Sequence, residues 1–213
     1  MRRLVQGDVG SGKTAIALAA SCLTAKAGHQ TALMAPTEIL ARQHLESARL
    51  LLGPLGIRCG LLLGGMKAAD RREAVRQISS GEWDLVIGTQ ALFSEGIEYK
   101  DLALVITDEQ HRFGVRQRKR LSEKTPDGQD AHVLVMSATP IPRTLALMLY
   151  GDLDISVVDE LPPGRTPVKT RVVSEKKRED MYRFIRDEVA EGRQAYLVCP
   201  LVSESEAIEA ENA

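Results

Sequence analysis

The sequence has little of what marks a secreted, membrane-spanning or metal-rich protein. It contains only three cysteines, odd in number, far apart and without C-x-x-C spacing, which argues against a disulfide framework or a cysteine zinc site. Its four histidines likewise lack metal-ligand spacing. No apolar run approaches the ~18 residues of a membrane span, and the N-terminal MRRLVQ is not a signal peptide. These absences predict a cytoplasmic protein with no membrane partner.

The chain also lacks a large net charge of either sign. Its 28 Lys and Arg residues almost balance 29 Asp and Glu residues, and the formal net charge of −1 argues against a uniformly basic nucleic-acid-binding protein. Positive charge is instead local. Residues 111–124, HRFGVRQRKRLSEK, are mostly basic, and a second set on an expected helix comprises Lys67, Arg71, Arg72 and Arg76. Because both sets follow the ends of expected strands, where ligands gather in open α/β sheets, they are either phosphate contacts or solvated helix faces.

The clearest motif is GDVGSGKT at residues 7–14, which matches G-x-x-x-x-G-K-[ST]. Glycines allow backbone conformations closed to other residues, so consecutive N–H groups can converge on phosphate oxygens at the start of the next helix. Lys13 would reach the β- and γ-phosphates, and the Thr14 hydroxyl would bind Mg²⁺. The motif predicts a nucleotide site formed by Gly7, Asp8, Val9, Gly10, Ser11, Gly12, Lys13 and Thr14.

Short β-rich runs alternate with helical patterns along the chain. Strands are expected at RRLVQ, TALMAP, IRCGLLL, DLVIGT, LALVITDEQH and HVLVMSATP, with helical sequence between them. The stretches ALVIT and VLVMS lack polar alternation, as is typical of strands buried on both faces. The pattern predicts an α/β fold in which a parallel sheet carries helices on both faces.

A domain boundary is expected near DELPPGRTPV, residues 159–168, because its prolines and glycine interrupt regular structure. We expect a first domain at residues 1–158, a connection at 159–167 and the start of a second α/β domain at 168–213. In the second domain, VKTRVV, SEKKREDMYRFIRDEVAEG and RQAYLVCPLV predict strand, helix and strand. This stretch is too short for a complete parallel-sheet domain, so the chain is expected to be a piece of a longer protein.

A second phosphate-related motif follows the apolar stretch LALVIT. The segment VITDEQH places Asp108 and Glu109 at the carboxyl edge of the expected sheet, beside the phosphate loop. Asp108 would hold Mg²⁺, usually through water, and Glu109 would position and deprotonate the attacking water. Together with residues 7–14, these acids predict a nucleotide hydrolase rather than a passive nucleotide binder.

The segment SATPIPRT, residues 137–144, follows another apolar strand. Ser137 and Thr139 offer short hydroxyls in a turn, and the two prolines fix the chain before the next helix. With Gln110 and His111, the motif suggests a hydrogen-bonded relay, running through Ser137, Ala138 and Thr139, between the carboxylates and a surface that could carry a polymer. A simple Ser/Thr turn is the alternative.

Six segments stand in the order found in bacterial DNA helicases of superfamily 2: GDVGSGKT, APTEILARQH, GTQALF, DEQHRFGVRQR, SATPIPRT and YGDLDISVVDELPPGRTPV. Over essentially its whole length the chain resembles members that remodel branched DNA. The combination of DEQH with DELPPGRTPV separates it from the transcription-repair coupling factors, which tend to have DEEQ. The resemblance implies RecA-like P-loop motor domains that use ATP and Mg²⁺ to translocate on duplex DNA. Its implied roles are in repair and recombination, on stalled replication forks and Holliday junctions.

The resemblance also implies which residues contact DNA. Backbone N–H groups and short hydroxyls suit phosphate contacts that ignore sequence. The implied contacts are Pro36, Thr37, Glu38, Gly88, Thr89 and Gln90, then Gly64, Gly65 and Lys67, and the basic residues Arg116 and Arg118. His111 would join the carboxylate motif to Ser137 and Thr139 and so couple the nucleotide state to the grip on DNA.

Members of this family have parts that the 213 residues do not match. These are a wedge domain that recognises the branch, a segment that helps hold adenine, and the remainder of the second motor domain with its arginine-bearing motifs. We therefore expect the chain alone to bind ATP weakly and to hydrolyse it slowly. Two alternatives remain open: a duplex translocase of the transcription-repair coupling type, and a nucleotide-binding switch or small-molecule kinase.

Overall fold

The computed structural model describes residues 1–108, 131–138, 153–160 and 168–198. The chain divides into two compact units, Met1–Arg165 and Thr166–Ala213, which are described separately below. Within the described residues, no helix combines the length and the apolar character needed to cross a bilayer.

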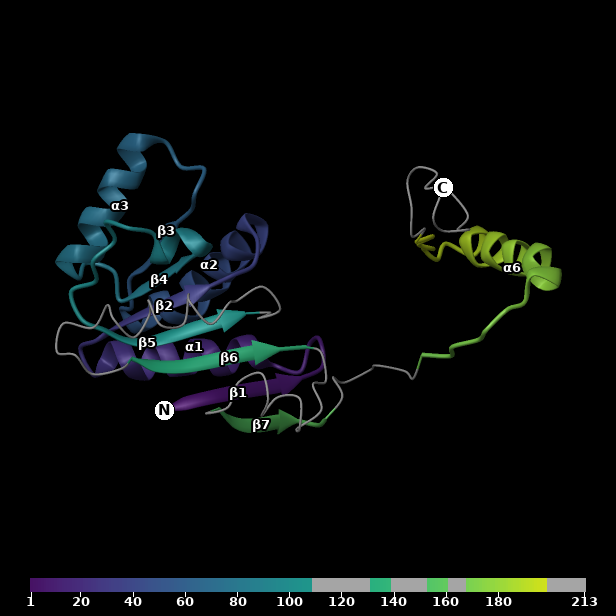
Figure 1. Cartoon of the computed structure of the whole chain (residues 1–213), viewed down its shortest axis with the longest axis horizontal. Helices are drawn as coiled ribbons and strands as arrows, with labels where there is room; N and C mark the ends of the chain where they lie inside the picture. The colour runs from purple at the N-terminus through teal and green to yellow at the C-terminus, as the bar shows by residue number, and fades with distance from the viewer. Residues whose placement is uncertain (109–130, 139–152, 161–167, 199–213) are drawn as a thin grey trace, which may run out of the picture. The chain divides into compact units, whose positions relative to one another are not determined.

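The first unit is built on one sheet of parallel strands, whose arrowheads all point the same way (Figure 1). The order of the seven strands is β3-β4-β2-β5-β6-β1-β7. Their bounds are β1 (Arg2–Gly7), β2 (Gln30–Met34), β3 (Cys59–Leu62), β4 (Leu85–Gly88), β5 (Leu102–Asp108), β6 (His132–Ser137) and β7 (Asp154–Val158). Strands β2 and β4 are buried at every position, because sheet neighbours and covering helices enclose them.

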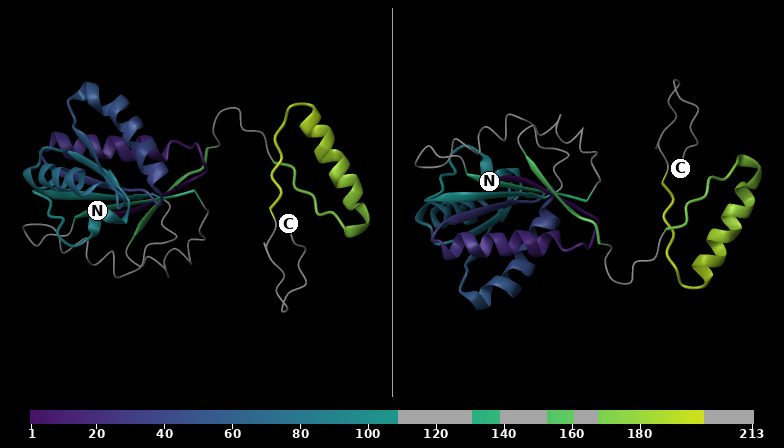
Figure 2. Two further views of the ribbon diagram at one scale, coloured as in Figure 1. Left: turned by 90° about the horizontal axis from the view of Figure 1, so that it is seen from above. Right: turned by 90° about the horizontal axis from the view of Figure 1, so that it is seen from below.

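Helices cover both faces of this sheet. The helices α1 (Lys13–Lys26) and α2 (Glu38–Leu52) lie on the same side (Figure 2) and share one apolar cluster, which includes Leu18, Leu45 and Leu33. The opposite-facing strand residues, such as Val105, join a second cluster with α3 (Ala68–Ser80) and the 3₁₀ helix η2 (Gln90–Phe93). Successive strand residues thus point to opposite faces. The α/β fold predicted from the sequence is confirmed.

Local sequence explains where two of these helices begin and end. The Thr37 hydroxyl accepts a hydrogen bond from the backbone N–H of Leu40 and so caps α2. The apolar stripe of α2 recurs at helical spacing through Ala41, Ala48 and Leu52, and the short 3₁₀ helix η1 (Gly53–Leu55) follows it. Helix α3 ends at Gly81, which has a φ of 75° that favours glycine.

Strand β7 was not predicted from the sequence. Its residues, DISVV, are short and only partly buried, and they pair with β1 at the edge of the sheet. The strand forms because β1 offers a parallel partner, with Val5 opposite Ser156. The helices expected within 112–124 and 142–151 lie outside the described residues.

The described part of the second unit contains η4 (Glu175–Lys177) and α6 (Arg178–Ala190). The helix agrees with the sequence prediction. The strand expected at 168–173 is not a strand in the structure, nor is the described part, 193–198, of the strand expected at 193–202. A strand needs a neighbouring strand to satisfy its N–H and C=O groups. None of the described residues of this unit supplies one.

Candidate nucleotide and metal site

The predicted phosphate loop connects β1 to α1 at the carboxyl edge of the sheet. Gly10 and Gly12 have φ values of 84° and 89°, a left-handed conformation that favours glycine. Gly12 caps α1 without a side-chain hydrogen bond, and the first turn of α1 contains no acidic residue. The positive end of the helix and its first N–H groups are therefore suited to an anion such as phosphate.

The loop holds its own lysine in place. The Nζ atom of Lys13 donates to the main-chain oxygens of Gly7 at 2.7 Å and Asp8 at 2.8 Å, and the side chain is buried. A Cβ atom on Gly7 would lie 2.6 Å from Ser11 Oγ and 3.0 Å from Val158 Cβ, so a side chain there would force its neighbours to shift. Ser11 Oγ is buried and has no hydrogen-bond partner among the described residues. A buried hydroxyl of this kind fits a loop that closes on an additional polar group.

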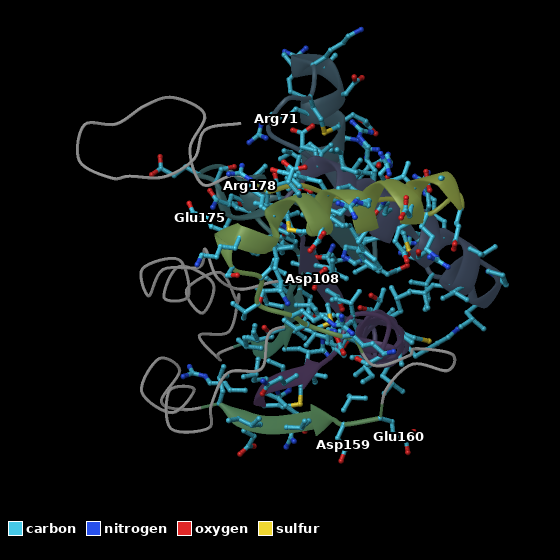
Figure 3. All side chains as sticks on the ribbon, turned by 90° about the vertical axis from the view of Figure 1, so that its right-hand side faces the viewer. Arg71, Asp108, Asp159, Glu160, Glu175 and Arg178 are labelled. Atoms are coloured by element: carbon cyan, nitrogen blue, oxygen red, sulfur yellow. The ribbon has the colours of Figure 1, made fainter. Side chains whose placement is uncertain are left out.

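Asp108 ends β5 at the same edge of the sheet (labelled in Figure 3) and lies opposite Met136 of β6. Its Oδ2 atom is 2.8 Å from Nε2 of His44, and the two side chains are 15% and 9% exposed, respectively. The sequence prediction assigned no role to His44. The available signal was a polar residue beside the apolar stripe of α2, which calls for a buried hydrogen-bond partner.

Hard oxygen ligands suit Mg²⁺, which usually keeps several waters and few protein ligands. Among the described residues, no group of three or more His, Cys, Asp or Glu side chains could hold a metal. The predicted pair, the hydroxyl of Thr14 and the carboxylate of Asp108, is consistent with this sparse mode of binding. The residues present therefore fit a magnesium ion that is bound jointly with a nucleotide.

The three predicted DNA-contact segments follow three neighbouring strands, in the order β3-β4-β2. Pro36, Thr37 and Glu38 follow β2; Gly64, Gly65 and Lys67 follow β3; and Gly88, Thr89 and Gln90 end β4 and begin η2. Because the strands are parallel, these segments share one edge of the sheet with the phosphate loop. A Cβ atom on Gly88 would lie 2.0 Å from the Leu62 main-chain oxygen, which requires glycine at that turn.

The basic residues on and before α3, which are Lys67, Arg71, Arg72 and Arg76, differ in how available their side chains are to a ligand. The Arg76 guanidinium donates to Glu73 and Glu82, and these hydrogen bonds raise its pKa. Nη2 of Arg71 (labelled in Figure 3) donates to Ser94 Oγ at 3.0 Å, which ties α3 to the segment after η2. Lys67 makes no ion pair with another described residue. Of the set, Arg76 is therefore best explained as a solvated, internally paired side chain.

Several predicted site residues cannot be placed. Ser137 is fully buried at the end of β6, with Ala138 after it, on the strand that neighbours β5. The other predicted residues of the relay and the hydrolytic site, Glu109, Gln110, His111 and Thr139, lie outside the described residues. The same holds for the predicted DNA contacts Arg116 and Arg118.

Comparison with known proteins identifies relatives of this arrangement. The DEAD/DEAH box helicase family model matches residues 2–148. The chain is 54% identical to the ATP-dependent DNA helicase RecG of Haemophilus influenzae, over 100% of this chain and 31% of the relative. It is 52% identical to RecG of Acidithiobacillus ferridurans, over 98% and 30%. The chain thus spans about a third of the length of these curated relatives.

Solved structures agree with this. A structure of RecG bound to a three-way DNA junction matches with a TM-score of 0.75 and 44% identity, over 90% of this chain and 25% of that one. The helicase domain of Hef from Pyrococcus furiosus matches with a TM-score of 0.57 and 22% identity, over 76% and 36%, which shows a shared fold alone. The relationship to ATP-dependent DNA helicases, predicted from the motifs, is confirmed.

Proposed function

Because the chain belongs to the DEAD/DEAH box helicase family, we propose that it is the ATP-binding motor segment of a helicase that remodels branched DNA. One observation carries the proposal. A single edge of one parallel sheet holds the phosphate loop after β1, the carboxylate at the end of β5 and the three turns after β2, β3 and β4 that we assign to DNA contact. A motor must connect its nucleotide site to its DNA contacts, and the shared edge of the sheet supports the proposal that both lie on this unit.

The nucleotide chemistry follows from the residues of the loop. Lys13 would exchange its contacts with the Gly7 and Asp8 oxygens for the β- and γ-phosphates of ATP. Thr14 and Asp108 would hold Mg²⁺, which neutralises charge on the phosphates when bound. In the same proposal Glu109 orients and deprotonates water, and the DEQH motif communicates through His111 with Ser137, Ala138 and Thr139.

The DNA contacts are proposed along the same edge. The turns at residues 36–38, 64–67 and 88–90 present backbone N–H groups and short polar side chains, which suit phosphates of any sequence. Branched DNA is the proposed substrate, because a relative whose structure contains a three-way junction is 44% identical over most of this chain. Action on chromosomal DNA would place the protein in the cytoplasm, at the nucleoid.

The domain assignment is part of the proposal. We assign residues 1–158 to a first RecA-like motor domain, 159–167 to a connection and 168–213 to the start of a second motor domain. The wedge domain and the remainder of the second motor would belong to the complete gene product, in line with the three-fold greater length of the relatives. Closure of ATP between two motor domains would then be needed for full turnover.

The test compares DNA substrates. In the complete gene product, ATP turnover should rise more with a three-way junction than with linear duplex of equal length. Equal stimulation by linear duplex would favour a transcription-repair coupling type of translocase. Turnover that no DNA stimulates would indicate a nucleotide switch, and the helicase proposal would fail.

A further inference from the structure

We propose that His44 is a positioning residue for the magnesium site, and that it orients Asp108 through its Nε2 atom. The inference rests on the proposed function, since it concerns the same nucleotide and metal site. His44 belongs to α2, which contributes no residue to the phosphate loop. Its contact with the end of β5 therefore brings a second element of the fold to the metal-binding carboxylate.

The geometry defines the direction of the hydrogen bond. Nε2 of His44 lies 2.8 Å from Oδ2 of Asp108. An ionised carboxylate only accepts hydrogen bonds, so the Nε2 atom carries the proton and donates it. This bond engages one carboxylate oxygen and favours one orientation of the group. The other oxygen, Oδ1, is then the one that a metal-bound water would contact.

The surroundings of His44 argue for this role. The side chain is nearly buried and lies on α2 between Ala41 and Ala48, which are fully buried in the apolar core. A leucine would fill such a place without the cost of removing a polar ring from water. The imidazole offsets that cost through its hydrogen bond to Asp108. Its position is thus explained by the carboxylate rather than by packing alone.

Carboxylates that bind metals are commonly held by a further hydrogen bond, and loss of that partner typically weakens metal affinity by about 10-fold to 100-fold. The same magnitude is expected here. The effect should appear in the Mg²⁺ dependence of nucleotide binding and not in binding that proceeds without metal, because the hydrogen bond of His44 goes to the carboxylate.

Two substitutions separate the hydrogen bond from simple burial of a polar group. In His44→Gln, the amide nitrogen can take the place of Nε2 and donate to Asp108. In His44→Asn, the amide nitrogen reaches only the place of Nδ1 and cannot donate. Leu52→Ala, at the far end of the same helix, removes buried apolar contacts without touching Asp108 and serves as the control for lost stability.

The experiment uses the complete gene product and a fluorescent ATP analogue, titrated with Mg²⁺ and repeated in EDTA. We expect His44→Asn to raise the Mg²⁺ concentration at half-maximal binding by about 10-fold to 100-fold. We expect His44→Gln and Leu52→Ala to stay near the unmodified chain, and binding in EDTA to be the same for all. If His44→Asn does not fold, His44→Leu, which suits the apolar stripe, takes its place with the same expectation.

An unchanged Mg²⁺ requirement in His44→Asn would overturn the inference, as would an equal rise in His44→Gln or in the Leu52→Ala control. Equal weakening of binding with and without metal would also overturn it, since a purely structural role has that result. If the unmodified gene product bound no nucleotide at all, the proposed function itself would fail, so the two failures are distinguishable.

Discussion

The ammonium group of Lys13 donates to the main-chain oxygen of Gly7 at a distance of 2.7 Å, so the phosphate loop and the first residue of α1 are joined by a hydrogen bond. The acceptor is a neutral carbonyl, as is that of Asp8. A nucleotide would offer negatively charged phosphate oxygens instead, which adds the attraction of opposite charges to the hydrogen bond. The Lys13 side chain thus already lies within the phosphate loop. Exchange of its two carbonyl contacts for phosphate oxygens would favour nucleotide binding.

Lys13→Ala should therefore weaken binding of an ATP analogue to the chain by about 10-fold to 100-fold, the usual worth of a hydrogen bond to a charged group. Equilibrium fluorescence titration measures the change. Lys26→Ala is the matched control, because Lys26 lies at the other end of α1 and donates to the Leu55 main-chain oxygen. Equal affinities for all three chains would contradict the assignment of the loop.

Gly7→Ala should destabilise the first unit by about 1–3 kcal/mol, the typical cost of overpacking. The added methyl group would meet Ser11 Oγ at 2.6 Å and the Val158 backbone at 3.2 Å. Gly53→Ala is the control, since a Cβ atom there has nothing within 4 Å. Urea unfolding of the three chains checks the difference. A loss of stability in Gly53→Ala as large as in Gly7→Ala would count against the explanation.

Glu109→Gln in the complete gene product should keep Mg²⁺-dependent ATP binding and lose hydrolysis by roughly 10²-fold to 10⁴-fold, the usual contribution of a positioned general base. The two measurements are turnover with junction DNA present and analogue binding at equilibrium. Turnover close to that of the unmodified protein would show that another residue activates the water.

The interaction of Asp84 with Arg58 leads us to expect that the free energy of unfolding depends on pH. Burial acts to raise its pKa, but hydrogen bonds from the side chain and the backbone N–H of Arg58, together with the Arg58 charge, outweigh this and lower the pKa. A carboxylate with a lowered pKa stabilises the fold above its unfolded value of about 3.9, and this contribution is lost as pH falls through the folded value.

Asp84→Asn should thus lower the unfolding midpoint near pH 7 and flatten its fall below about pH 4. Urea unfolding at several pH values measures both. Glu73→Gln is the control, because Glu73 pairs with Arg76 at an exposed position and such pairs contribute little. The prediction would be wrong if both variants followed the same pH profile.

If Arg116 and Arg118 contact DNA phosphates, they contribute to the salt dependence of DNA binding. Replacing both by glutamine in the complete gene product should weaken binding to all sequences alike and reduce the slope of log affinity against log salt by about 2. Arg76→Gln is the comparison, since its guanidinium is already paired with Glu73 and Glu82. An unchanged slope for the double variant would indicate that the basic segment is only a solvated face.

The parts of the site that depend on local backbone chemistry were predictable from the sequence. Gly10, Gly12 and Lys13 stand close together in the sequence, so their spacing alone predicted the glycine-rich turn that the structure has between β1 and α1. Asp108 was also recognisable, because it ends an apolar strand. The contact between His44 and Asp108 was not, since 64 residues separate the two and only the packing of α2 on the sheet brings them together.

Some strands of the fold could likewise be predicted from the sequence, and others could not. Strands such as β5 were predicted because burial on both faces leaves an unbroken apolar run. Strand β7 was missed because a strand at the edge of a sheet is only partly buried and needs no apolar run. It forms through its pairing with β1. The expected strand at 168–173 failed for the opposite reason: its β-branched residues favour an extended chain, but no described neighbour pairs with it.

The position of β1 between β6 and β7 has a consequence for how the molecule acquires its structure. Arg3 pairs with Leu134 on one side and with Asp154 on the other, so both partners emerge from the ribosome more than a hundred residues later. Such distant pairings close slowly, and domains form from the amino end during synthesis. Strand β1 therefore stays without its partners until β6 and β7 have been synthesised, after β2, β3 and β4. The phosphate loop follows β1 directly, so a chain that stalls in translation before β6 lacks both of the strands that hold the start of this loop in place.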